Sequence, residues 1–163
     1  MSDYNTSMDL SELVQEFGRR FGIDDVGLNA QGACNVVFDG KTSLFFESVP
    51  DQPAGFICAE LARFPDDEQY RLRLFDVLME ANYFGLETGD GAFAASRQTG
   101  RVVFFKKFTT TDLSVDEFIL LVRDFTETFE YWRNQIEVEL PAALSQTGGS
   151  PQGEEGYPDS LKI

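Results

Sequence analysis

Residues 34–49 read CNVVFDGKTSLFFESV, and this stretch decides the fold. Asp39 and Gly40 stand between two apolar runs. An Asp-Gly pair in that position is the strongest short-range signal for a two-residue β-hairpin turn. The pattern therefore predicts two antiparallel strands, over residues 34–38 and 41–49.

Further strands are expected on the C-terminal side of this hairpin. A loop bounded by Pro50 and Pro53 precedes residues 56–61, which complete a three-strand meander. Residues 92–97 and 101–108 form a second predicted hairpin, because two apolar runs flank a short turn that contains glycine.

Three helices are predicted around these strands. The first covers residues 8–21 and has apolar residues at helical spacing: Leu10, Leu13, Val14, Phe17 and Phe21. The second covers residues 68–84. The third begins at Ser114, with Glu117 completing a capping box, and ends near residue 140. The fold class is therefore α+β, with a curved antiparallel sheet packed with three helices in the order α-βββ-α-ββ-α.

The chain of 163 residues suits one domain, expected over residues 1–140. Residues 141–163 contain Gly, Ser, Pro and Gln and few aliphatic residues. They are interpreted as a disordered acidic and polar tail.

The net charge of −15 restricts the partners of the protein. Binding to nucleic acid depends on Lys and Arg, and anionic membrane surfaces repel an acidic protein. Neither is an expected partner, although the acidity could also serve solubility alone. The two cysteines, Cys34 and Cys58, are expected as free thiols of a cytoplasmic protein, since secreted domains of this size usually carry more.

The residue types that most enzymes need are missing. The chain has no histidine, which removes Ser-His and Cys-His pairs and metal sites that contain histidine. The carboxylate runs 24–25 and 66–68 lack the spacing of a calcium loop, and we interpret them as turn and capping residues. No catalytic residue, cofactor or metal site is predicted, and an enzyme that uses carboxylates alone is the remaining enzymatic reading.

The predicted strands are apolar on both faces. In residues 41–49, Leu44 and Phe46 share one face while Phe45 lies on the other, because successive strand residues alternate. Both faces then need cover, which the three helices must supply. We predict that an apolar partner segment is bound by the first helix and the meander through Leu13, Phe17, Val36, Phe38, Leu44, Phe45 and Phe46.

The second helix also carries two apolar stripes. One can face the sheet, and the other predicts a contact with a second copy of the chain. The alternative is that one chain covers both stripes by itself. The predicted dimer-interface residues are Leu72, Phe75, Met79 and Phe93.

Several segments resemble the class I type III secretion chaperones, the Tir-chaperone-like family. The resemblance spans about residues 8–140 and lies in five segments taken together. They are residues 13–23 (LVQEFGRRFGI), 28–34 (LNAQGAC), 74–82 (LFDVLMEAN), 97–103 (RQTGRVV) and 129–133 (FEYWR).

This resemblance implies a bacterial cytoplasmic homodimer without enzymatic activity. Such a chaperone binds the N-terminal segment of a secreted effector in extended form, keeps it soluble and secretion-competent, and directs it to the secretion ATPase. The alternative is a regulatory protein that masks one folded or small partner and so couples secretion to gene expression. A flat interface would suit masking, whereas a groove and an open strand edge would suit an extended chain.

Overall fold

A computed structural model describes residues 8–38 and 40–141 of the protein. The turn residue Asp39 and almost all of the segment interpreted as a tail lie outside the described residues. The described part contains five strands and three α-helices, in the order predicted from the sequence.

The five strands form one antiparallel sheet in the order β1-β2-β3-β5-β4. Their bounds are Ala33–Phe38 for β1, Thr42–Ser48 for β2, Ala54–Arg63 for β3, Ala92–Ser96 for β4 and Arg101–Thr109 for β5. The meander and the second hairpin join through the pairing of β3 with β5, which runs from Ala54↔Thr109 to Arg63↔Arg101. Strands β1 and β4 are the two edges of this sheet.

The helices are α1 (Leu10–Phe21), α2 (Glu68–Ala81) and α3 (Val115–Asn134). The predicted capping box of α3 is present, with Ser114 and Glu117 each accepting a hydrogen bond from the other's backbone N–H. A single turn of 3₁₀ helix, Tyr83–Gly85, follows α2. A π-helical segment, Gln135–Glu139, extends α3.

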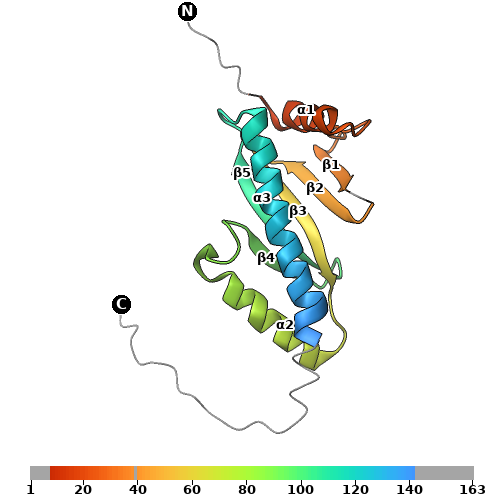
Figure 1. Cartoon of the computed structure of the whole chain (residues 1–163), viewed down its shortest axis with the longest axis vertical. Coiled ribbons are helices and arrows are strands. Elements are labelled where there is room, and N and C mark those ends of the chain that lie inside the picture. The colour runs from red at the N-terminus through yellow and green to blue at the C-terminus, as the bar shows by residue number, and fades with distance from the viewer. Residues whose placement is uncertain (1–7, 39, 142–163) are drawn as a thin grey trace, which may run out of the picture.

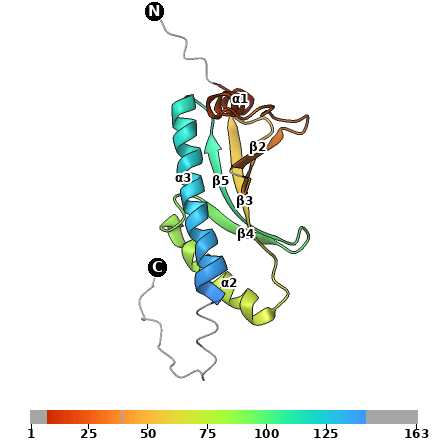
Figure 2. The ribbon, with the colours of Figure 1, turned by 45° about the vertical axis from the view of Figure 1, so that its right-hand side comes forward.

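Helix α3 lies along one face of the sheet, and α1 packs at one end of it (Figure 1). Helix α2 lies at the other end, below β4 and beside the C-terminal part of α3 (Figure 2). The hydroxyl of Tyr70 on α2 donates to the carbonyl of Ile136, 3.3 Å away, and so joins these two elements.

The core lies between this face of the sheet and the helices. An apolar stripe runs along α3 and the segment after it and is buried along its whole length: Phe118, Val122, Phe125, Phe129, Trp132 and Ile136. Phe118 sits at the junction of α1 and the sheet, with its ring 6.0 Å from that of Phe17 and 5.7 Å from that of Phe46. Phe104 stacks on Phe125 at 4.8 Å.

The opposite face of the sheet has no helix over it in the described part of the chain (Figure 2). Leu44 and Phe46 are buried, whereas Phe45 points to this other face and is exposed, as the predicted alternation requires. The interpretation that helices cover both faces is therefore wrong. The physical reason is that α1, α2 and α3 all bury their apolar stripes in one common core.

Candidate partner-binding site

Helix α1 is held in place at both ends. At its start, the Asp9 carboxylate accepts from the Glu12 N–H at 2.9 Å, and the Glu12 carboxylate accepts from the Asp9 N–H at 3.0 Å. At its end, Gly22 takes a left-handed conformation with φ +64°, which favours glycine. This geometry leaves Phe21 in the last turn with 53% of its surface exposed.

An apolar groove of about 290 Å³ lies where α1, α3 and the end of β1 meet. Its aromatic wall is made by Phe17, with the ring of Phe21 4.7 Å away and the ring of Phe38 5.7 Å away. We call it the α1–α3 groove, and its lining is Phe17, Phe21, Phe38, Ile119, Val122, Arg123, Thr126 and Glu127.

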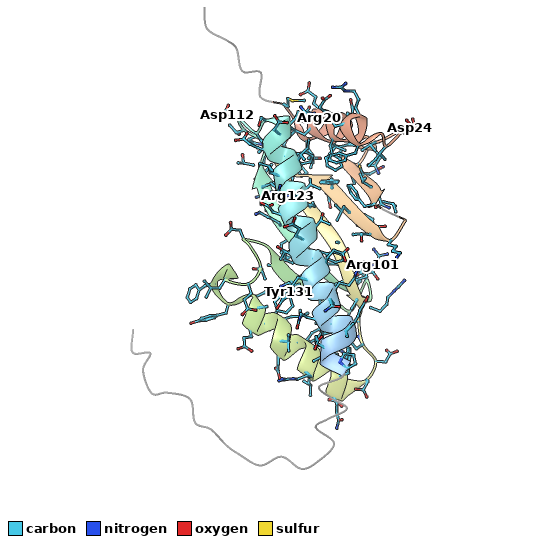
Figure 3. The ribbon with its side chains drawn as sticks, viewed as in Figure 1. Arg20, Asp24, Arg101, Asp112, Arg123 and Tyr131 are labelled. Carbon is cyan, nitrogen blue, oxygen red and sulfur yellow. The ribbon has the colours of Figure 1, made fainter. Side chains whose placement is uncertain are left out.

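Charged groups stand only at the rim of the α1–α3 groove. Arg123 is paired with Asp124 at 3.0 Å and with Glu127 at 3.9 Å, and Figure 3 shows it on the surface of α3. The groove can therefore accept an apolar side chain without burying a charge. Burying one leucine or phenylalanine would contribute about 1.5–3 kcal/mol.

The α1–α3 groove adjoins an unpaired strand edge. Strand β1 pairs with β2 alone, so its other edge leaves backbone groups without a strand partner in the described part of the chain. Phe38, the last residue of β1, also lines the groove. An extended segment could thus pair with β1 and place apolar side chains in the groove at the same time.

The uncovered face of the sheet is a second accessible apolar surface. It carries Val37, which is 50% exposed, and Phe45. Beside them lie Phe56, Cys58 and Phe105, all half-buried, with Cys58 between Phe45 and Phe105 in the strand register. We call this surface the open sheet face.

The seven residues predicted to bind a partner divide between the core and these two surfaces. Phe38 lines the α1–α3 groove, and Phe45 lies on the open sheet face. Phe17 contributes the buried wall of the groove. The others have no more than 1% of their surface exposed: Leu13, Val36, Leu44 and Phe46. Partner binding by the full set stays a prediction, and in this conformation only Phe38 and Phe45 present much surface.

Six of the eight lining residues were not among the predicted site residues: Phe21, Ile119, Val122, Arg123, Thr126 and Glu127. Phe21 had been assigned to the inward stripe of α1, and Ile119 and Thr126 were not singled out. The spacing of Ile119, Val122 and Thr126 is the available signal, because these positions share one flank of an α-helix. That signal does not say which neighbour the flank faces.

The predicted dimer-interface residues differ in accessibility. On α2, Leu72 is 60% exposed and Met79 is 58% exposed, so the second apolar stripe faces outward as predicted. Phe75 is half-buried, with its ring 5.6 Å from that of Phe64. Phe93 is buried between Phe104 and Trp132, which keeps it from any interface in this conformation. More exposed apolar side chains follow α2: Tyr83, Phe84 and Leu86.

Both cysteines are free, and burial raises the pKa of each thiol. A raised pKa lowers the fraction of reactive thiolate at neutral pH. Among residues 8–38 and 40–141, no three His, Cys, Asp or Glu side chains lie close enough together to hold a metal ion. None of the helices in the described part of the chain is long and apolar enough to cross a membrane.

Comparison with sequence families gives one match. The model described as the Tir chaperone protein (CesT) family matches residues 12–133. That range includes most of α1, the whole sheet, α2 and nearly all of α3. A search of curated proteins found no significant match.

Solved structures with the same fold include three complexes. The ExsC–ExsE complex superposes with a TM-score of 0.65 and 18% identity, covering 79% of this chain and 97% of that one. The HopA1–SchA chaperone–effector complex superposes with a TM-score of 0.61 and 16% identity, covering 75% of this chain and 91% of that one. The Yersinia pestis type III secretion chaperone SycH, in complex with a fragment of YscM2, superposes with a TM-score of 0.55 and 15% identity. The match covers 75% of this chain and 98% of that one.

Proposed function

The chain belongs to the Tir chaperone protein (CesT) family, and from that membership we propose that it binds the N-terminal segment of a type III secreted effector as an extended chain. In this role it keeps the effector soluble and secretion-competent. The protein acts in the bacterial cytoplasm by binding and carries out no catalysis.

One observation carries the proposed mode of binding, namely the apolar α1–α3 groove beside the unpaired edge of β1. Main-chain hydrogen bonds to a strand edge give affinity with little demand on sequence, and a neighbouring apolar pocket selects particular side chains. This combination suits a chaperone, which must hold its cargo without folding it. Two structures with the same fold, a chaperone–effector complex and a type III secretion chaperone, support the same assignment.

The working unit in this proposal is a homodimer. Its interface would use the outward stripe of α2, with Leu72 and Met79, and the exposed side chains that follow this helix. Large apolar side chains left in water favour association. The loaded dimer would then pass its cargo to the secretion ATPase.

The test uses residues that are exposed, so that the variants fold. Phe21→Asp places a charge at the mouth of the α1–α3 groove, and Val37→Asp places one beside the β1 edge. The matched control is Tyr131→Asp, an exposed aromatic residue of α3 outside the groove lining (Figure 3). The cargo probe is the N-terminal segment, about one hundred residues, of the protein encoded by the adjacent gene, coexpressed with the chaperone.

The expected result is a loss of at least about ten-fold in cargo affinity for Phe21→Asp, since burial of one large apolar side chain corresponds to more than 1.4 kcal/mol. Val37→Asp should weaken binding less, and Tyr131→Asp should leave it unchanged. Equal affinity for all three variants would refute the groove. A cargo segment that is already folded when free, by circular dichroism, would favour the masking function instead.

A further inference from the structure

One flank of α3 changes character along its length. Ile119, Val122, Thr126, Glu130 and Arg133 share this flank, because their spacing keeps them on one side of an α-helix. The first three line the apolar α1–α3 groove. The last two reach the start of β2, where the Thr42 hydroxyl donates to Glu130 at 2.7 Å and the Arg133 guanidinium donates to the Thr42 oxygen at 3.2 Å.

A second hollow, also about 290 Å³, opens at this polar end. It lies where β2 and β3 separate, since their pairing stops at Phe45↔Cys58. We call it the basic hollow, because Lys41, Arg101 and Arg133 line it against a single lining carboxylate, Glu60. Its full lining is Lys41, Thr42, Ser43, Phe45, Glu60, Leu61, Ala62, Arg101, Phe129 and Arg133.

The positive charge extends beyond the hollow itself. Arg63 faces Arg101 across the β3–β5 pair, and both contact Glu60, at 3.3 Å and 3.2 Å. Arg71 and Arg97 stand over the ring of the next residue, Phe64, at 5.9 Å and 5.3 Å. Six of the thirteen basic residues of a chain with net charge −15 thus gather around this end of the sheet.

In the lining of the basic hollow, cations outnumber carboxylates three to one. Arg63 and Arg101 share Glu60, which each contacts through its Nε atom. Arg133 is paired with Glu130. Lys41 has no ionic partner among the described residues, and Figure 3 shows Arg101 at the surface. Guanidinium groups are suited to carboxylates, which they bind in a planar, bidentate way.

The basic hollow lies within reach of a segment bound in the α1–α3 groove. Phe38 of the groove and Thr42 of the hollow are register partners at the end of the β1–β2 hairpin. Along α3, the eleven-residue separation of Val122 and Arg133 corresponds to about 16 Å. An extended chain covers that distance in about five residues.

We propose that the cargo segment carries acidic side chains about five residues from its apolar anchors, and that Lys41, Arg101 and Arg133 bind them in the basic hollow. This inference rests on the proposed function and adds a selection rule to it. The surface of the chaperone is mostly acidic and repels an acidic segment. The basic hollow is therefore the place where such a segment gains affinity, and binding there fixes the position of the segment along the chaperone.

Synthetic peptides test the rule. Each fluorescein-labelled peptide, about 16 residues long, carries leucines at alternate positions, followed about five residues later by Glu-Glu. A matched peptide has Gln-Gln at that place, and another has Glu-Glu directly after the leucines. Binding to the full chain is measured by fluorescence anisotropy at low and high salt, with the variants Lys41→Gln and Arg101→Gln. Lys107→Gln, a cation at the other end of the sheet, is the control.

The correctly spaced Glu-Glu peptide should bind about five-fold more tightly than the Gln-Gln peptide at low salt, and high salt should remove the difference. Lys41→Gln and Arg101→Gln should each reduce the preference, and Lys107→Gln should retain it. Equal affinity of all peptides overturns the inference but leaves the groove intact. Failure of every peptide to bind overturns the groove as well. A preference that emerges only after removal of residues 142–163 assigns the hollow to the chain's own acidic segment and overturns the inference.

Discussion

Gly91 shows how little room single residues have in this core. A Cβ atom at this position would lie 2.5 Å from the Cζ atom of Phe104, a fully buried ring that stacks on Phe125. Phe104 cannot move without disturbing that stack. Gly91→Ala should therefore destabilise the protein by about 1–3 kcal/mol through overpacking.

Thermal unfolding followed by circular dichroism measures this effect, with an expected fall in Tm of roughly 3–10 °C for a chain of this length. Gly27→Ala is the matched control, because the nearest atom to a Cβ there is 3.9 Å away. A variant Gly91→Ala as stable as the control would mean that the sheet moves to accommodate the methyl group.

Glu117 is expected to make stability depend on pH. Hydrogen bonds from the Ser114 hydroxyl, at 2.6 Å, and from the Ser114 N–H, at 2.9 Å, lower the pKa of this carboxyl group. A group with a lowered pKa in the folded state stabilises the protein above its unfolded pKa, and this contribution is lost as pH falls through the folded pKa.

The Tm of the unchanged protein should exceed that of Glu117→Gln at neutral pH. The difference between the two Tm values should shrink below about pH 4.5, where the carboxyl group of the unfolded chain begins to bind a proton. In a Ser114→Ala background the substitution should have a smaller effect, since the hydrogen bond from the hydroxyl is already lost and only the one from the backbone N–H remains. A difference that stays constant down to pH 3 would contradict this assignment.

The features of single residues that could be predicted are those that depend on neighbouring residues in the sequence. The cap at Ser114 and the alternation of Leu44, Phe45 and Phe46 follow from backbone chemistry and strand geometry, and the structure has them as predicted. Accessibility was less predictable. Leu13 and Val36 were proposed to touch a partner, yet they are buried, because the pattern of one strand or helix does not say which neighbour covers its apolar side.

At the scale of elements, Asn82 joins α2 to the edge strand β4. Its side-chain amide donates to the carbonyl of Phe93 at 3.1 Å, and its oxygen accepts from the N–H of the same residue at 2.8 Å. The side chain thus acts like a further strand residue beside β4. Asn82 had been noted only as part of the segment LFDVLMEAN, and nothing local in the sequence indicates this contact.

Asn82→Ala should destabilise the protein by about 1–3 kcal/mol, because it leaves a backbone donor and acceptor of β4 without partners. Amide hydrogen exchange at Phe93 should become faster while exchange in β2 stays unchanged. Asn82→Asp, which keeps the acceptor and loses the donor, should retain more protection at the Phe93 N–H than Asn82→Ala does. Unchanged exchange in both variants would show that β4 holds its place without this side chain.

The order and pairing of the elements were predicted better than the face of the sheet that the helices cover. The order of strands and helices follows from turn signals and caps, and the pairing of β3 with β5 joins the two predicted hairpins into one sheet. The number of helices did not reveal that they share one face. Which side of a sheet a helix covers depends on long-range contacts, such as that of Phe118 with Phe46, which leave no local pattern.

For the whole molecule, the exposed stripe of α2 predicts self-association. The combined change Leu72→Glu and Met79→Glu should convert the homodimer to monomer, since it places four carboxylates across a symmetric interface. Both residues are exposed in one protomer, so the folded chain should keep its Tm at low concentration. Light scattering at micromolar concentration measures the mass, with Leu120→Glu on α3 as the control. An unchanged protein that is already monomeric would refute the dimer.

The limit of the domain can be tested by truncation. Leu140 is buried and Pro141, which follows it, is exposed, so the described core closes at this point. Removal of residues 142–163 should change Tm by less than about 2 °C, because this segment has few aliphatic residues to add to a core. A fall of more than about 5 °C would show that the C-terminal segment docks on the domain and contributes about 1 kcal/mol or more.

Because the two edges of the sheet have no further strand beside them in the described part of the chain, the acidity of the chain affects how fast copies of the protein associate. Strand β1 offers an open template on which another copy could add, and β4 offers one beyond Phe93, whose backbone groups bond Asn82. Repeated addition leads to fibrils. At neutral pH the charge of −15 makes approaching copies repel one another. Near the isoelectric point of about 4.2 that barrier vanishes while both edges remain. Colloidal stability in this molecule is therefore supplied by charge rather than by closure of the sheet, and acid or high salt removes it before the fold is lost.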